Sequence, residues 1–108
     1  MAIYLITMEA KKGIFCKTGI TSDMDSRMRQ YRCHNPLAKL DSYIETRKGS
    51  KLGAQLENDF HAEMQARGME RNVNGTEWFY TESEEIMEGI ARNGIGFFDS
   101  CKGRKIYR

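Results

Sequence analysis

The 108-residue chain has little proline, little cysteine and no long apolar segment. With one proline and no linker-like stretch, it is expected to fold as a single domain over residues 1–108. Its apolar runs fall short of the roughly 20 residues that a membrane helix needs, and Glu9 interrupts the N-terminal run where a signal peptide would continue. These absences predict a cytoplasmic protein without membrane contact.

The cysteines argue against two further classes of protein. Cys16, Cys33 and Cys101 are odd in number and widely spaced, so neither a disulfide framework nor a paired zinc motif is visible. We expect reduced thiols. The neighbouring Cys33 and His34 leave one minor alternative, a thiol or zinc protein.

Charge is informative through its distribution. The net charge of +2 is too small to imply a nucleic-acid partner by itself. The first third of the chain is basic, however, and the end of the chain predicts a basic C-terminal tail at about 97–108. The basic residues of the first third are Lys11, Lys12, Lys17, Arg27, Arg29 and Arg32.

Two strand-like segments, "AIYLIT" and "GIFCKTG", open the chain on either side of the polar turn "EAKK". They predict a β-hairpin. A helix is predicted next over "TSDMDSRMRQYR", with Thr21, Ser22 or Asp23 as its N-cap. The residues on its apolar face, which we interpret as core, are Met24, Met28 and Tyr31.

The second half predicts further strands and helices. "KLDSYIET" is predicted as a strand before a turn at Gly49 and Ser50, and "SKLGAQLENDFHAEMQARG" as the longest helix, ended by Gly68. A short strand "TEWFY" precedes the helix "SEEIMEGIARN", which a Thr81–Glu84 capping box begins and Gly94 ends. The apolar ridge of the longest helix comprises Leu52, Leu56, Phe60 and Met64. This order indicates an α+β fold.

Four polar residues on different elements are candidates for one site: Tyr4, Lys17, Arg27 and Glu57. A phosphodiester site needs a carboxylate for Mg²⁺, a guanidinium for the phosphate and a group that activates water. Arg27 flanks the buried stripe of its helix, so it can reach back over the strand ends. Taken singly, each residue also has an ordinary explanation as a half-buried strand residue, a solvated cation or a surface acid.

Four short motifs occur in the order and spacing of the GIY-YIG endonuclease superfamily. The strands with "AIYLI" and "CKTGIT" precede Arg27, which lies eight residues after Gly19, and "LENDFH" and "TEWFY" follow later. The chain resembles in particular a compact phage and bacterial branch, in which the second motif reads Lys-Ile-Gly-x-Thr and later segments read Leu-Glu-x-x-x-His and Glu-Trp-Phe. The resemblance spans about residues 3–80.

This resemblance implies a layered α/β/α sandwich with a small central three-stranded antiparallel sheet. It also implies Mg²⁺-dependent hydrolysis of DNA phosphodiesters, with Mn²⁺ as a substitute. Glu57 would bind the metal, Arg27 would hold the scissile phosphate, and Tyr4 would orient or deprotonate the attacking water. Gly19 would permit close backbone packing.

The expected partner is double-stranded DNA with weak sequence preference, because no zinc finger or helix-turn-helix accompanies the motifs. Cutting both strands would need a homodimer or successive nicks.

Departures from the superfamily leave the general base open between Tyr4 and Lys17. Lys17 stands where the wider superfamily has a tyrosine, and Thr18 replaces its isoleucine. Lys17 could bind phosphate or accept a proton. His61 is expected to hydrogen-bond Glu57, with metal ligation or base work as alternatives. The candidates for the superfamily's late asparagine are His61, Asn74 and Glu77.

A noncatalytic nucleic-acid-binding or host-factor-binding module is the alternative function. The Lys17 and Thr18 replacements favour it, whereas Arg27 and Glu57 favour the nuclease. Trp78 and Phe79 are expected to pack in the core, with base stacking as the lesser alternative.

Overall fold

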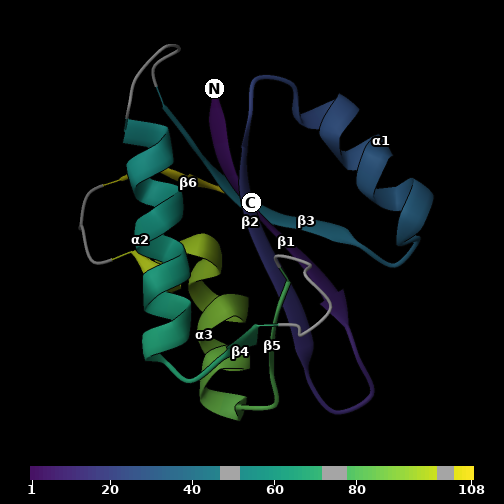
Figure 1. The fold of residues 1–108 in the computed structure, drawn as a ribbon, viewed down its shortest axis with the longest axis vertical. Coiled ribbons are helices and arrows are strands. Elements are labelled where there is room, and N and C mark those ends of the chain that lie inside the picture. The colour runs from purple at the N-terminus through teal and green to yellow at the C-terminus, as the bar shows by residue number, and fades with distance from the viewer. Residues whose placement is uncertain (47–51, 72–77, 100–103) are drawn as a thin grey trace.

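One antiparallel sheet organises the protein (Figure 1). The computed structural model describes residues 1–46, 52–71, 78–99 and 104–108. The sheet has six strands in the order β4-β5-β2-β1-β3-β6. The strands are β1 (Ala2–Glu9), β2 (Ile14–Thr21), β3 (Lys39–Glu45), β4 (Glu70–Arg71), β5 (Phe79–Thr81) and β6 (Ile106–Tyr107).

The predicted α+β class holds, but the small three-stranded sheet is wrong. The hairpin and β3 form the centre, and short strands extend the sheet at both edges: β5 and β4 beyond β2, and β6 beyond β3. β5 corresponds to the predicted "TEWFY" strand. β4 and β6 have two residues each, which is too short for an alternating pattern to predict.

Helices lie on both sides of the sheet (Figure 1). The helix α1 covers one face, whereas α2, α3 and a 3₁₀ helix, η1, cover the other. No helix in the part of the chain that the structure describes is long and apolar enough to cross a membrane. The helices are α1 (Met24–His34), α2 (Leu52–Ala66), α3 (Glu84–Asn93) and η1 (Gly94–Phe98).

The helix caps agree with the sequence at α1 and differ at α3. Asp23 is the N-cap of α1, because its side chain accepts a hydrogen bond from the Ser26 N–H at 3.1 Å. The predicted start of α3 at Thr81 is wrong. Ser83 caps α3, and the Thr81 hydroxyl instead accepts from the Ser83 N–H at 3.1 Å. Gly94 ends α3 as predicted, with φ +57°.

The sheet divides the interior into two clusters. Leu56, Phe60 and Met64 of α2 are buried as predicted, but Leu52 is 42% exposed, and Gly53 takes its place against Ile20. Trp78 and Phe79 are both buried, which confirms their expected core packing. They lie on opposite faces, Phe79 with α2 and Trp78 with α1, because successive strand residues alternate.

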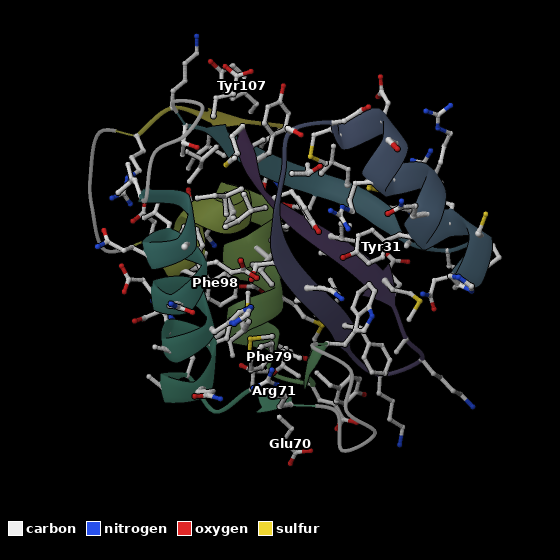
Figure 2. The ribbon with its side chains drawn as sticks, turned by 45° about the horizontal axis from the view of Figure 1, so that its top comes forward. Tyr31, Glu70, Arg71, Phe79, Phe98 and Tyr107 are labelled. Atoms are coloured by element: carbon white, nitrogen blue, oxygen red, sulfur yellow. The ribbon has the colours of Figure 1, made fainter. Side chains whose placement is uncertain are left out.

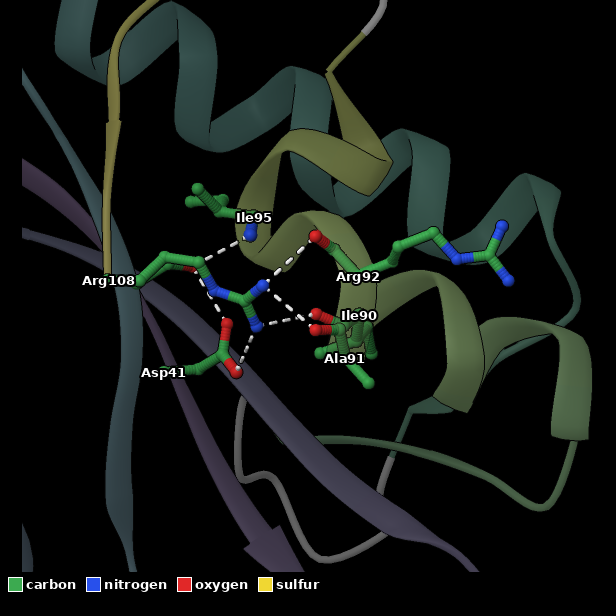
Figure 3. A network of polar contacts seen from close by, with 7 residues as sticks. Asp41, Ile90, Ala91, Arg92, Ile95 and Arg108 are labelled. Carbon is green, nitrogen blue, oxygen red and sulfur yellow. Dashed lines mark hydrogen bonds and ion pairs between the residues drawn. The ribbon is translucent and has the colours of Figure 1, made fainter.

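The segment predicted as a basic tail contributes to the fold (Figure 3). The Arg108 guanidinium donates to the carbonyl oxygens of Ile90, Ala91 and Arg92 at 2.8–3.0 Å and lies 3.6 Å from an Asp41 carboxylate oxygen. These carbonyls belong to the last turn of α3, where the Gly94 N–H donates to that of Ile90 and Arg108 adds donors for all three. Arg108 therefore links α3 to β3.

Candidate functional site

The Tyr4 side chain crosses β2 above Gly19. The two residues face each other in the β1–β2 register. A Cβ atom at position 19 would lie 2.2 Å from the Tyr4 hydroxyl oxygen, so any side chain there would displace the phenol. Gly19 is therefore required for packing within the sheet, and it brings the Tyr4 hydroxyl over β2.

The part of β2 beneath this hydroxyl lies at an open edge. β5 pairs with β2 only from Ile14 to Cys16, so the next part of β2 has no further strand on that side among the described residues. The helix α2 lies beside this part, where Gly53 packs against Ile20. Glu57 comes one turn after Gly53 on α2, so its carboxylate lies at the border of the sheet.

The helix α1 supplies two polar groups from the other side of the sheet. Arg27 and Tyr31 are four residues apart and so lie on the same face of α1. The Tyr31 and Tyr4 hydroxyl oxygens are 2.9 Å apart and share a hydrogen bond. Figure 2 shows Tyr31 on the side of α1 that faces the strands.

Lys17 lies beside the same pair of phenols. Its Nζ atom is 5.1 Å from the centre of the Tyr31 ring, at the distance of a cation–π contact. Trp78 packs edge-on against Tyr31, with ring centres 6.3 Å apart. The rings of Tyr31 and Trp78 thus form an apolar surface. The hydroxyls of Tyr4 and Tyr31 and the ammonium group of Lys17 lie beside it.

The charges of Arg27 and Glu57 both act on the Tyr4 phenol. Burial raises the pKa of this phenol well above its ordinary range, and the hydrogen bond with Tyr31 raises it further. The Arg27 guanidinium lowers the same pKa, whereas the Glu57 carboxylate raises it. Tyr4 therefore keeps its proton near neutral pH, which favours orienting a water molecule over deprotonating one.

His61 does not form the expected hydrogen bond from its Nε2 atom to Glu57. This nitrogen is buried and has no hydrogen-bond partner within the described ranges, while the ring packs against Phe79 at 5.6 Å between ring centres. His61 therefore faces the apolar cluster under α2, and its role in chemistry stays a prediction. Asn74, Glu77 and Cys101 lie outside the described residues.

The donor set fits Mg²⁺ bound together with a substrate. Among residues 1–46, 52–71, 78–99 and 104–108, no three His, Cys, Asp or Glu side chains gather in one place. Glu57 is the carboxylate whose charge reaches the Tyr4 phenol. Mg²⁺ commonly takes one or two protein carboxylates, keeps several waters and completes its ligands with substrate phosphate, so one such carboxylate is adequate.

Tyr31 is the site residue that the sequence did not reveal. Its spacing with Met24 and Met28 indicates core, and its ring does pack in that cluster. The sequence did contain a signal for it: Tyr31 lies four residues after Arg27, so both side chains are on one helical face.

The site thus combines phenols and a guanidinium, which can donate to phosphate oxygens, with a carboxylate, which can hold a cation. The sequence matches the T5orf172 domain over residues 1–94. The chain therefore belongs to the T5orf172 domain family, a phage-associated family structurally related to GIY-YIG and HNH-like nucleases. No curated protein and no solved structure is significantly similar to it.

Proposed function

We propose that this protein is a small Mg²⁺-dependent DNA endonuclease of the GIY-YIG type, which hydrolyses phosphodiesters by attack of water. One observation carries the proposal. The Tyr4 hydroxyl, which lies over β2 because position 19 has no side chain, bonds to Tyr31 on the helical face that also carries Arg27. The charges of Arg27 and of Glu57, from the helix on the opposite face, both act on this phenol, and such perturbed groups cluster at functional sites.

Arg27 would hold the scissile phosphate. Its guanidinium presents a fork of N–H donors that matches two phosphate oxygens, and it stabilises the charge that grows on them as the bond breaks. Lys17, held against the Tyr31 ring, would add a second positive charge to the same face.

Glu57 would hold the Mg²⁺, which supplies Lewis-acid stabilisation of phosphate charge when bound. Glu57 is half-buried on α2, which packs beside the part of β2 that pairs with no further strand on that side among the described residues.

Tyr4 would orient the attacking water by accepting a hydrogen bond at its hydroxyl oxygen, because its raised pKa keeps the phenol neutral and its one proton is donated to Tyr31. Tyr31 would position Tyr4 through the bond between their hydroxyls. Tyr31 belongs to α1 and is a second phenol beside Tyr4. In the wider superfamily, a tyrosine occupies the position of Lys17. The Lys17 replacement does not therefore leave Tyr4 without a phenol partner.

The test is nicking of supercoiled plasmid at low salt with Mg²⁺, with Mn²⁺ and with EDTA. The proposal expects metal-dependent nicking that Glu57→Gln abolishes, because the amide cannot supply the anionic ligand. Asp59→Asn is the matched control, since Asp59 is an exposed acid on the same helix, and it should nick at the normal rate.

A noncatalytic nucleic-acid-binding module is the second candidate, favoured by the lysine at position 17. It predicts salt-sensitive retardation of the plasmid with no nicking by either the natural protein or the Glu57→Gln variant. Nicking that persists in EDTA, or that Glu57→Gln does not change, would contradict the metal-dependent nuclease.

A further inference from the structure

The face of β2 that carries Gly19 continues beyond the site toward the hairpin turn. Because strand residues alternate, Gly19, Lys17, Phe15 and Gly13 share this face. The Tyr80 ring, from β5, reaches back to Gly13, which lies just before β2. A Cβ atom at position 13 would meet the Thr81 carbonyl oxygen first and would lie 2.9 Å from the Tyr80 hydroxyl oxygen. Tyr4 and Tyr80 thus lie at the two ends of this face of β2.

Phe15 and Tyr80 form an aromatic pair on this face. They are direct partners in the β2–β5 ladder, and their ring centres lie 4.7 Å apart at 48°. Both are half-buried, so part of the pair faces solvent. The Tyr80 hydroxyl donates to a Glu82 carboxylate oxygen at 2.9 Å, which fixes the ring. The pair is a half-exposed apolar surface at the margin of the core cluster that Phe15 packs against.

Lysines lie on both sides of the pair along the chain, while the Tyr80 hydroxyl bonds to Glu82 and Tyr80 pairs with Glu70 of β4. Lys17 lies between it and Gly19, and Lys11 and Lys12 are exposed in the turn that joins β1 to β2. The turn lysines also line a hollow with Met87 and Ile90 of α3, so they lie at the end of the hairpin and border the opposite face of the sheet as well. Cations that alternate with exposed rings are the pattern of proteins that bind single-stranded nucleic acid.

The distance between Gly19 and Phe15 fits a nucleic-acid strand that extends from the Tyr4 hydroxyl along β2. Gly19 and Phe15 are four residues apart, which is about 13 Å at roughly 3.3 Å per strand residue. A stacked nucleic-acid strand advances about 3.4 Å per nucleotide, so the pair lies about four nucleotides from the Tyr4 hydroxyl.

We infer that these residues, Lys17, Phe15, Tyr80, Lys11 and Lys12, form a track that binds an unpaired nucleic-acid strand next to the phosphodiester held at Arg27. The inference rests on the proposed function and specifies its substrate, a nucleic acid whose strand beside the cleaved bond is single-stranded. Paired bases in a duplex present no ring face to Phe15 and Tyr80, whereas unpaired bases can stack on them.

The first test is fluorescence anisotropy of a short labelled oligothymidylate in EDTA, where no metal-dependent cleavage occurs. Tyr80→Ala should weaken binding by about fivefold or more, because stacking of one base is worth about 1–3 kcal/mol. Tyr80→Phe keeps the ring and should bind within about twofold of the natural protein.

Tyr107→Ala is the matched control. Tyr107 is half-buried and stacks on Tyr43 at 5.0 Å, but this pair lies at the β3–β6 edge, away from β2. The track predicts no loss of affinity there. Equal losses in Tyr80→Ala and Tyr107→Ala, or a blunt duplex that binds the natural protein as tightly as the oligothymidylate, would overturn it.

The second test does not depend on how Tyr80→Ala folds. Replacing Lys11 and Lys12 by Ser changes only exposed turn residues. It should reduce the slope of log affinity against log salt by about 0.7 for each lysine that meets a phosphate. Lys105→Ser, an exposed lysine over the Tyr107 ring, should leave the slope unchanged. An unchanged slope in the Lys11 and Lys12 variant would contradict the track.

Cleavage and binding separate the two proposals. Binding that depends on Tyr80, without metal-dependent nicking, would support the track and refute the nuclease. If the protein nicks plasmid but Tyr80→Ala binds the oligothymidylate as tightly as the natural protein does, the track is refuted and the nuclease is supported.

Discussion

The two faces of the sheet differ in what packs against them. Against α2, α3 and η1 the sheet buries an almost wholly apolar cluster, in which Figure 2 shows Phe79 and Phe98. Against α1 it places phenols and an indole beside Lys17, and the hydroxyls of Tyr4 and Tyr31 bond to each other. We infer that one face holds the fold together, whereas the other carries most of the proposed site, to which α2 adds Glu57. Changes on the first should alter stability, and changes on the second should alter activity.

The largest effect is expected on the apolar face. Phe60 is fully buried in α2, so Phe60→Ala should lower the free energy of unfolding by about 3–5 kcal/mol. Urea unfolding followed by circular dichroism measures this change. A loss below about 1 kcal/mol would contradict the assignment of this face as the stabilising core.

The next effect is expected at Gly19 on the other face. Gly19→Ala places a methyl group where the Tyr4 hydroxyl lies, so the phenol must move. Misplacement of a catalytic group by about 1 Å can cost about a hundredfold in rate, and we expect that loss in plasmid nicking.

Gly53→Ala is the control for this substitution. A Cβ atom there meets Ile20 at an ordinary 3.6 Å, so nicking should be unchanged. Equal nicking by the two variants would show that the position of Tyr4 over β2 has no part in the reaction.

A smaller effect is expected at Tyr31. Tyr31→Phe removes one hydrogen bond, worth about 0.5–1.5 kcal/mol, so nicking should fall by about two- to tenfold while stability changes little. The bond raises the pKa of Tyr4, so its removal lowers that pKa. Because a Tyr4 phenolate would repel the phosphate, the alkaline loss of activity should begin at lower pH in the variant. A pH–rate profile that moves the other way would contradict the orienting role of Tyr4.

Long elements were predictable from the sequence, and contacts between them were not. The hairpin, α1, β3, α2 and α3 each carry enough residues for periodicity to show. β4 and β6 depend on pairing with distant strands, so no local pattern marks them. Within the site, the motifs indicated Tyr4, Arg27 and Glu57. They did not show that Tyr31 bonds Tyr4, because the position of a hydroxyl depends on how α1 packs on the sheet.

The most direct test of the account compares two arginines on one helix. Arg27 acts on the Tyr4 phenol, whereas Arg29 is exposed and lines a groove with Asp25 and Arg32. In single-turnover plasmid nicking with Mg²⁺, we predict that Arg27→Ala loses about 10²–10³-fold in rate, as expected for a group that stabilises developing phosphate charge, while Arg29→Ala stays within about threefold. Equal losses in the two variants would mean that these arginines only attract nucleic acid, and would contradict a catalytic site on the α1 face of the sheet.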